Sequence, residues 1–357
     1  MAESVKPIEG IAEPLVRWYH ANERAFPWRT DPSPYRVWVS EIMLQQTRIE
    51  AALPYFERFM QALPTVADLA ACSEDVLMKL WEGLGYYSRA RNLQKAARRV
   101  MEEYGGELPR DYEQLLALPG IGEYTAGAIA SMAFGIAAPA VDGNVLRVMA
   151  RLTNDDRDVM QTVPRRELTA LVRRIVPTDD PGAFNQGIME LGETICLPNT
   201  MPKCASCPIK AYCAVAGSER AAQLPTRAAA KPRRVERRTV LVVITDEPTP
   251  RLLLHKRPSK GLLSGLWELP NLLTDADAVL FPEEAVIDTA PLGDAVHVFS
   301  HVEWRMQGYL VKVKPFTLNN DCRLVTATEL AAYALPTAFR AFMTEIPRLL
   351  GVKEDVL

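Results

Sequence analysis

The chain has 357 residues, of which 48% are hydrophobic and 24% are charged, and it carries a net charge of −3. This length exceeds what one core usually supports, so two or three globular domains are expected, and the charge excludes a strongly basic protein. The apolar runs are interrupted and the first residues, MAESVKPIEG, lack a signal-peptide pattern. We therefore expect a cytoplasmic protein that does not enter a membrane.

The first informative segment is VWVSEIMLQQTRIE, residues 37–50, in which Glu41 has apolar neighbours on both sides. A glutamate in such a helix is expected to be at least partly buried, and burial raises the pKa of a carboxyl group. A carboxylic acid that keeps its proton near neutral pH can act as a general acid. A surface glutamate on an amphipathic helix is the alternative, and this segment alone does not exclude it.

The helical pattern continues over most of the N-terminal part of the chain. Apolar residues spaced three or four apart predict helices over 65–80, 89–104 and 165–176. We therefore expect residues 1–220 to form a domain that is almost entirely helical.

Within this domain, LPGIGEYTAGAI at 118–129 interrupts the helical pattern with two glycines, Gly120 and Gly122. Glycines permit positive φ and close backbone approach, and a helix that begins near Glu123 would offer free N–H groups to a phosphate. Residues from about 111–134 therefore predict a helix–hairpin–helix element, which holds a nucleic-acid backbone without reading its sequence. An ordinary helical hairpin with a glycine turn is the alternative.

The segment PAVDGNVLRVMARL, residues 139–152, places Asp142 directly before a helical run, with Asn144 two residues later. Aspartate is a preferred helix N-cap, so capping alone would explain it. However, the helix that follows the hairpin has the length to bring Asp142 back near the nucleic-acid backbone that the hairpin would hold. A glutamate with a raised pKa and an ionised aspartate form the pairing that cleaves glycosidic bonds, so Glu41 and Asp142 are a candidate catalytic pair.

Four of the six cysteines lie within residues 196–213, with the spacing C-x7-C-x2-C-x5-C. Without a signal peptide, this clustering indicates a metal centre rather than disulfides. Four thiolates can hold a tetrahedral zinc ion or a [4Fe–4S] cluster, and the spacing alone does not separate the two. The candidate ligands are Cys196, Cys204, Cys207 and Cys213.

The character of the chain changes after residue 220. Residues 221–238 contain six basic residues and one glutamate, which predicts a linker that is either simply solvated or a tether for a polyanion. Beyond it, short β-branched or alternating runs, among them HVFSHVEW at 297–304, predict strands. Two helical stretches follow, near 327–334 and 336–349. Residues 239–357 are therefore expected to form a small α+β domain.

Together these segments resemble the helix–hairpin–helix DNA glycosylases of the endonuclease III superfamily, and most closely the MutY-type adenine DNA glycosylases. Further matching segments span nearly the whole chain: FPWR (26–29), SEIMLQQT (40–47), GLGYYSRARNL (83–93), FNQGIMELG (184–192), GLLSGLWELP (261–270) and FSHVEW (299–304). The family usually has six residues between its first two clustered cysteines, whereas this chain has seven, LPNTMPK.

The resemblance implies a mainly α glycosylase fold, with a six-helix barrel lobe and an iron–sulfur lobe that holds one [4Fe–4S] cluster. It also implies that the C-terminal domain is Nudix-like. This domain lacks the glutamate-rich helix of the Nudix hydrolase signature, so it is expected to recognise a lesion without hydrolysis. The protein is expected to act as a monomer.

The resemblance further implies a reaction: hydrolysis of the N-glycosidic bond of adenine mispaired with 8-oxoguanine or guanine in double-stranded DNA, which leaves an abasic site. Glu41 would protonate the adenine, and Asp142 would stabilise the oxocarbenium ion, with Tyr124 and Asn144 positioning it. Relatives that cut the strand carry a Schiff-base lysine where this chain has Tyr124. Because a phenol cannot form an imine, Tyr124 predicts a monofunctional glycosylase.

The resemblance assigns three further groups of residues. Those expected to line the adenine pocket are Arg24, Trp28, Arg29, Leu44 and Gln186. Those expected to contact DNA are Gln46, Thr47, Tyr86, Gly120 and Gly122. Those expected to contact 8-oxoguanine are Phe299, Ser300 and His301.

Three other functions compete with this interpretation. A glycosylase that removes thymine opposite guanine is disfavoured by the C-terminal lesion-reading domain. A bifunctional lyase is disfavoured by Tyr124. A cluster-containing DNA-binding protein without catalysis is disfavoured by the joint presence of Glu41 and Asp142.

Overall fold

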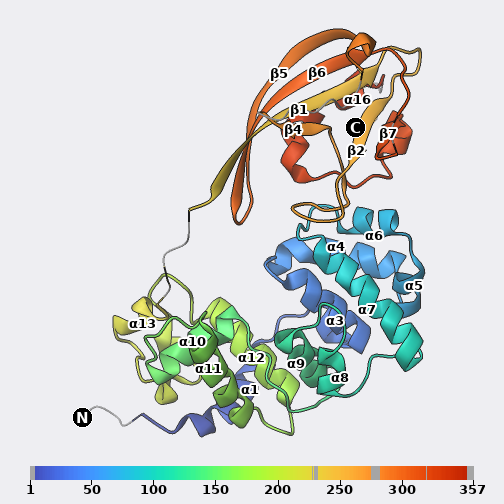
Figure 1. Ribbon diagram of the computed structural model, residues 1–357. Helices are drawn as coiled ribbons and strands as arrows, with labels where there is room; N and C mark the ends of the chain where they lie inside the picture. The colour runs from blue at the N-terminus through green and yellow to red at the C-terminus, as the bar shows by residue number, and fades with distance from the viewer. Residues whose placement is uncertain (1–4, 227, 229–231, 275–281, 319, 352–357) are drawn as a thin grey trace. The chain divides into compact units, whose positions relative to one another are not determined.

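The computed structural model describes residues 5–226, 228, 232–274, 282–318 and 320–351. The chain divides into two compact units, one of Met1–Ala71 with Arg91–Ala229 and the other of Cys72–Ala90 with Ala230–Leu357 (Figure 1). Part of the predicted linker, Arg227 and residues 229–231, lies outside the described residues, as do the first four residues of the chain. None of the described helices combines the length and the hydropathy that crossing a bilayer requires.

The first unit is built from helices, as the apolar spacing predicts. Its α-helices are α1 (Ala12–Asn22), α2 (Pro27–Thr30), α3 (Pro34–Leu44), α4 (Ile49–Ala62), α5 (Val66–Ala71), α7 (Ser88–Tyr104, whose first three residues belong to the second unit), α8 (Tyr112–Leu116), α9 (Glu123–Met132), α10 (Gly143–Thr153), α11 (Thr162–Ile175), α12 (Pro181–Thr194) and α13 (Arg220–Gln223). Short 3-10 turns are η1 (Ile8–Ile11), η2 (Cys204–Ser206) and η3 (Lys210–Tyr212).

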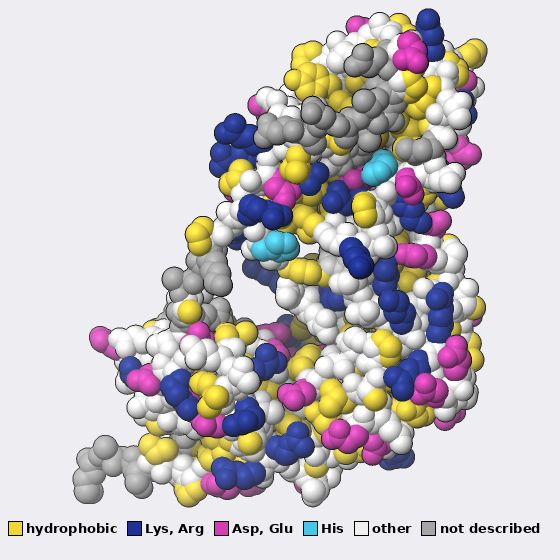
Figure 2. Space-filling model, in the orientation of Figure 1, with side chains coloured by type: hydrophobic (Ala, Val, Ile, Leu, Met, Phe, Trp, Pro, Cys, Tyr) yellow, Lys and Arg dark blue, Asp and Glu magenta, His cyan; other side chains and the backbone are white. Residues whose placement is uncertain are grey.

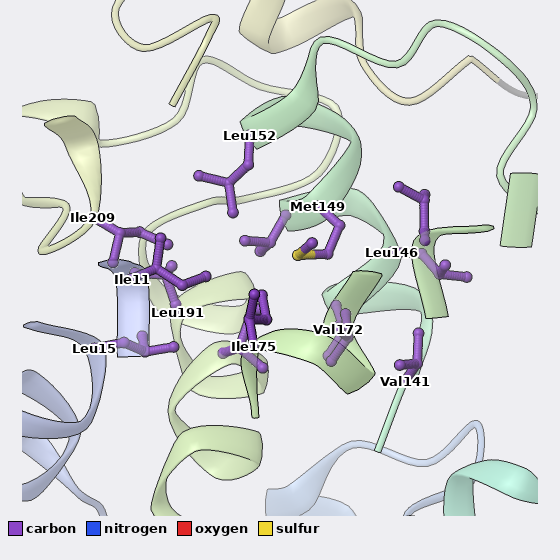
Figure 3. Packing of buried hydrophobic residues seen from close by; sticks show 14 of the residues in the cluster. Ile11, Leu15, Val141, Leu146, Met149, Leu152, Val172, Ile175, Leu191 and Ile209 are labelled. Atoms are coloured by element: carbon purple, nitrogen blue, oxygen red, sulfur yellow. The ribbon is translucent and has the colours of Figure 1, made fainter. Parts of the chain in front are cut away.

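A buried hydrophobic core surrounds α10 and fixes its position (Figure 3). The side chains that meet there come from the N-terminal segment, from three helices and from the cysteine loop. They include Ile11, Leu15, Met149, Leu152, Val172, Ile175, Leu191 and Ile209, each at most 5% exposed. Burial of these eight side chains away from water is the main contribution to the stability of this core. It anchors the helix whose N-cap is the candidate catalytic aspartate, Asp142.

Two glycines allow the neighbouring helices to approach the start of α10. A Cβ atom added to Gly127 on α9 would lie 2.0 Å from the carbonyl oxygen of Pro139. A Cβ atom on Gly192 of α12 would lie 2.8 Å from the Cβ atom of Asn144. Because neither distance is compatible with a real side chain, these positions need glycine for packing. The segment that leads into Asp142 is therefore held tightly between α9 and α12.

The hairpin between α8 and α9 uses its two glycines differently. Gly120 has a φ of +77°, and a Cβ atom there would lie 2.6 Å from the Cβ atom of Asn92, so the turn packs directly on α7. Gly122 has a φ of −96° and a ψ of 178°, and no described atom lies within 4 Å of its added Cβ atom. The expectation of positive φ is thus met only at Gly120. Gly122 instead leaves open space beside the first turn of α9, which no described side chain caps.

The second unit combines one sheet with short helices. Its strands are β1 (Arg234–Thr245), β2 (Leu252–Lys256), β3 (Trp267–Glu268), β4 (Asn271–Leu273), β5 (Val286–Val298), β6 (Val302–Val313) and β7 (Cys322–Val325). Its helices are α6 (Glu74–Trp81), η4 (Glu283–Ala285), α14 (Ala327–Leu330), η5 (Thr337–Phe339), α15 (Arg340–Met343) and α16 (Ile346–Leu349). The sheet has the order β3-β2-β1-β6-β5, with β4 paired to β1 and β7 paired to β2. β1 is parallel to β6, and β5 is antiparallel to β6.

Three sequence-based elements differ from the structure. The predicted strand over 297–304 is wrong as a continuous element, because the chain turns between β5 and β6. The predicted helix over 65–80 is two helices, since Ser73 caps α6 and accepts a hydrogen bond from the Val76 N–H. The predicted helix over 336–349 is three short turns. In each case the apolar periodicity is correct, but local capping or turn geometry interrupts it.

Candidate active site

A pocket of about 690 Å³ lies in the first unit, where α2, α3, α9, α10 and α12 meet. It brings together all the expected catalytic and adenine-pocket residues and two of the expected DNA contacts. These are Glu41, Tyr124, Asp142, Asn144, Arg24, Trp28, Arg29, Leu44, Gln186, Gln46 and Thr47. Their sequence positions span more than half of the unit, so the fold assembles the pocket from distant segments.

Glu41 lies on α3 and is only 5% exposed, which confirms the burial expected from its apolar neighbours. The Tyr124 hydroxyl donates a hydrogen bond of 2.5 Å to Glu41 Oε2. Burial raises the pKa of Glu41 to about 7, while the Tyr124 hydrogen bond and the Arg29 charge lower it and the Asp142 charge raises it. Burial and the nearby carboxyl groups of Glu41, Asp142 and Glu193 raise the pKa of Tyr124 well above its ordinary value, so Tyr124 is a neutral donor. Glu41 is therefore a carboxyl group that is partly protonated at neutral pH.

Asp142 combines the two roles that its sequence position suggested. Its Oδ1 accepts a hydrogen bond of 2.8 Å from the Val145 N–H and so caps α10. Its Oδ2 accepts one of 2.9 Å from Asn144 Nδ2. Burial raises the pKa of Asp142, and the hydrogen bonds from Val145 and Asn144 oppose this because they favour the charged form. The capping interpretation is thus correct, and the same side chain also faces the pocket.

Hydrogen bonds connect this end of α10 to the cysteine loop. Arg147 Nη2 donates to Asn144 Oδ1 at 2.9 Å, and Arg147 Nε donates to the Cys196 carbonyl oxygen at 2.9 Å. One turn further along α10, Arg151 Nη1 donates to Cys196 Sγ at 3.2 Å. The two arginines are 4% and 2% exposed, so they fix the loop from inside the protein.

The four clustered cysteines line a common cavity of about 30 Å³, together with Arg151 and apolar side chains. Burial raises the pKa of Cys207 to about 12 and that of Cys213 to about 11. Arg151 Nη2 is buried and has no hydrogen-bond partner among the described residues. Within the described part of the chain, no three His, Cys, Asp or Glu side chains are arranged to hold a single metal ion.

Apart from the hairpin glycines Gly120 and Gly122, the remaining expected residues lie in the second unit. Phe299, Ser300 and His301 form the turn between β5 and β6, with Ser300 and His301 exposed. The Phe299 ring lies 4.9 Å from the Trp304 ring, measured between centroids, which holds the turn on the sheet. Tyr86 is 48% exposed with a φ of 46°, and its hydroxyl lies 2.7 Å from Ser300 Oγ.

Sequence reasoning missed four pocket residues on α12. Met189, Glu190, Glu193 and Thr194 line the pocket beside Gln186. The five residues are spaced i, i+3, i+4, i+7 and i+8, which places them on one face of a helix. The resemblance supplied Gln186 alone, but its helical spacing would have identified the other four. Met189 Sδ lies 3.7 Å from the Tyr124 hydroxyl, and the two glutamates contact the pocket arginines.

The net charge of −3 does not by itself reveal a binding site for a polyanion. In Figure 2, acidic and basic side chains alternate over the lower part of the visible face, while several Lys and Arg side chains gather at mid-height on its right. Recognition of a negatively charged ligand would therefore depend on local groups, such as the uncapped first turn of α9.

Comparisons with known proteins agree with this geometry. Residues 39–174 match the model of the HhH-GPD superfamily of base excision DNA repair proteins, and residues 239–345 match a NUDIX domain. The adenine DNA glycosylase of Rattus norvegicus is 38% identical over 83% of this chain and 69% of its own length. That of Homo sapiens is 35% identical over 93% of this chain and 74% of its own length.

Among solved structures, a thermostable thymine-DNA glycosylase superposes with a TM-score of 0.52 and 29% identity. The superposition covers 57% of this chain and 93% of that protein. It thus confirms the helical glycosylase fold, while the sequence matches extend through the sheet unit. The chain belongs to the adenine DNA glycosylase family of helix–hairpin–helix base excision repair proteins.

Proposed function

We propose that this protein is a monofunctional glycosylase that hydrolyses the N-glycosidic bond of adenine mispaired with 8-oxoguanine or guanine in double-stranded DNA. The observation that carries the proposal is the buried Glu41, hydrogen-bonded to Tyr124 at 2.5 Å, in one pocket with Asp142. Two carboxyl groups with different surroundings suit an acid and an ion-stabilising partner. The family membership supplies DNA as the substrate class.

The helix–hairpin–helix element would hold the DNA backbone. Gly122 leaves open space next to the uncapped N-terminus of α9, whose free N–H groups favour a phosphate. Tyr124 lies in the first turn of the same helix and hydrogen-bonds Glu41. A phosphate bound at this turn would therefore fix the position of the DNA relative to the Glu41 carboxyl group. The target adenosine would be rotated out of the helix into the pocket, at an unstacking cost of a few kcal/mol.

Glu41 would act first as the general acid. With a pKa of about 7, a substantial fraction of its carboxyl groups carries a proton at neutral pH. Transfer of that proton to N7 makes adenine a neutral leaving group, and Glu41 becomes a carboxylate. Tyr124 then stabilises this carboxylate by its hydrogen bond. Glu41 would finally accept a proton from the attacking water.

Asp142 would stabilise the positive charge that develops on the sugar. Hydrogen bonds from Val145 and Asn144 keep its carboxylate oriented and favour its ionised form. An ionised carboxylate beside an oxocarbenium ion lowers the barrier electrostatically. No lysine is among the described residues that line the pocket, so no amine is available there for a Schiff base. Base removal without strand cleavage is the expected outcome.

The four cysteines would hold one [4Fe–4S] cluster. The four thiols share one cavity. Four thiolates suit either zinc or a cluster, so the choice of the cluster rests on the family resemblance. The buried cation of Arg151, with an Nη2 lacking a partner among the described residues, suits a negatively charged group in that cavity. When bound, the cluster would cross-link the cysteine loop through four iron–thiolate bonds.

The turn between β5 and β6 would read the opposite base. Ser300 and His301 are exposed polar groups on a turn that Phe299 anchors to the sheet. Such groups can hydrogen-bond a base edge, whereas phosphate contacts carry no sequence information. This unit would therefore distinguish 8-oxoguanine from guanine.

Single-turnover base release tests the proposal. The substrates are duplexes with adenine opposite 8-oxoguanine, adenine opposite thymine and thymine opposite guanine, each analysed with and without alkali. We expect breakage only at the mispaired adenine and only after alkali. Breakage without alkali would contradict the monofunctional mechanism, and release of thymine would contradict the substrate. Visible absorbance of the purified protein that is lost on acid treatment tests the cluster, and a colourless active protein would contradict it.

A further inference from the structure

Glu190 on α12 is a buried carboxylate that the proposed mechanism does not use. Its side chain is only 3% exposed, and its two oxygens accept hydrogen bonds from different arginines. Arg24 Nε donates to Oε1, and Arg29 Nη2 donates to Oε2 at 3.0 Å. Tyr19 on α1 is also nearby, and burial, with a contribution from the Glu190 charge, raises its pKa to about 12, so this phenol is neutral. Such complete pairing is what a buried carboxylate needs to remain charged.

The two arginines are fixed further by other groups. Arg29 Nη1 donates to the Arg24 carbonyl oxygen at 3.2 Å, and the Arg29 guanidinium carbon lies 5.1 Å from the centre of the Phe26 ring. Arg24 Nη2 donates to Glu193 Oε2 at 2.6 Å, and its Nη1 lies 3.9 Å from Glu50 Oε1. Both oxygens of Glu190 therefore bind arginines that line the pocket.

The charge on Arg29 matters for the acid. The titratable groups that influence Glu41 are Tyr124 from α9, Asp142 at the start of α10, Arg29 from α2 and Glu193 from α12. Arg29 is the cation of this set, and it lowers the pKa of Glu41, opposing the effect of burial. Glu190 forms an ion pair with that cation. Without Glu190, the charge of Arg29 would lose this compensation and would act more strongly on Glu41.

We propose that Glu190 is a positioning residue of the active site: it anchors Arg24 and Arg29 in the pocket wall and compensates their charge, so that Glu41 keeps its proton at neutral pH. This inference rests on the proposed function, in which Glu41 is the general acid. It explains why α12 presents a buried carboxylate to a pocket that already contains two catalytic ones. It also predicts in which direction the loss of Glu190 or of Arg29 should move the pKa of Glu41.

The test is the pH dependence of single-turnover adenine release by the full-length protein, between pH 5.5 and 9. In Glu190→Gln the pKa of Glu41 should fall, so that the alkaline limit of activity moves to lower pH. At pH 8 the Glu190→Gln variant should release adenine more slowly than wild type by a factor of about five or more. The two rates should converge toward pH 6. Glu190→Asp should restore much of the wild-type profile.

Arg29→Gln supplies an effect of opposite sign. Removing this cation should move the alkaline limit to higher pH, and the double variant with Glu190→Gln should return it toward the wild-type position. A purely structural role would not produce shifts that reverse and cancel. If Glu190→Gln does not fold, Glu190→Asp decides the question: its shorter side chain should leave a smaller shift of the alkaline limit to lower pH, and an unshifted profile would contradict the inference.

Glu268→Gln is the matched control. Glu268 is a buried glutamate, 2% exposed, that pairs with Arg257 at 2.9 Å in the second unit. It should lower thermal stability without moving the pH profile. If Glu190→Gln likewise slows the reaction equally at every pH, Glu190 is only structural and the inference is wrong. If wild type releases no adenine, the proposed function fails instead, so the two failures are distinguishable.

Discussion

The two units assemble their functional residues in opposite ways. In the helical unit, Glu41, Tyr124 and Asp142 come from three separate segments and meet only because the helices between them pack correctly. In the sheet unit, the three residues Phe299, Ser300 and His301 are consecutive in one turn between paired strands. The first site depends on tertiary packing, whereas the second depends on local geometry. Substitutions should therefore affect chemistry in one unit and base preference in the other.

The largest effect should come from Glu41→Gln. An amide cannot donate the proton that the departing base needs, so single-turnover release should fall by about a thousandfold. Binding to the same duplex should persist, because the phosphate contacts are elsewhere. Glu167→Gln, which alters a half-exposed glutamate paired with Arg157, is the control and should leave release unchanged. Substantial release by Glu41→Gln would show that another group is the acid.

The next largest effect tests how strongly the site in the helical unit depends on the packing of its helices. Gly127→Ala places a methyl group 2.0 Å from the Pro139 carbonyl oxygen, so α9 must move away from that segment. We expect a loss of about 3 kcal/mol in the free energy of unfolding, measured by denaturant titration. Gly143→Ala, where no described atom lies within 4 Å of the added carbon, should cost less than about 0.5 kcal/mol. Equal costs would mean that α9 is not packed as described.

A smaller effect should appear in the sheet unit. Ser300→Ala removes one hydroxyl from the exposed turn, worth about 1 kcal/mol, or roughly a fivefold change in preference for 8-oxoguanine over guanine. Release from an adenine–guanine mispair should stay within twofold of wild type, roughly, since the acid is unaffected. Both are measured as single-turnover rates on paired duplexes. An equal loss of rate on both substrates would contradict the proposal that one unit carries the chemistry and the other recognises the opposite base.

The smallest effect concerns the hydrogen bond between Tyr124 and Glu41. Release should decline in wild type as the pH rises through about 7, because Glu41 then loses its proton. The Tyr124 hydroxyl lowers the pKa of Glu41, so Tyr124→Phe should move this alkaline limit to higher pH. The measurement is the same rate profile. A limit that moves to lower pH would contradict the hydrogen bond as described.

The sequence predicts some of these features better than others. Burial of Glu41, the cap at Asp142 and the two-part fold all follow from local patterns, because periodicity and capping are local properties. Sequence reasoning paired these two residues by their chemistry and the resemblance supported the pair, but nothing in local spacing shows that α3 and the start of α10 line one pocket. Glu190 shows the limit most clearly. Its sequence context is that of an ordinary helical glutamate, and only the fold brings Arg24 and Arg29 to it.

Asp142 caps α10 and also faces the reacting sugar in the proposed mechanism. Because it has both roles, few other residues can replace it. Most replacements would lose the hydrogen bond to the Val145 N–H, so they would weaken the fold and abolish chemistry together. Asparagine, serine and threonine can still cap a helix, and of these asparagine alone keeps the shape of the aspartate side chain. An inactive but well-folded descendant of this protein would therefore most easily arise through Asp142→Asn. Such a variant would accumulate normally in cells, and a survey based on protein abundance would miss it.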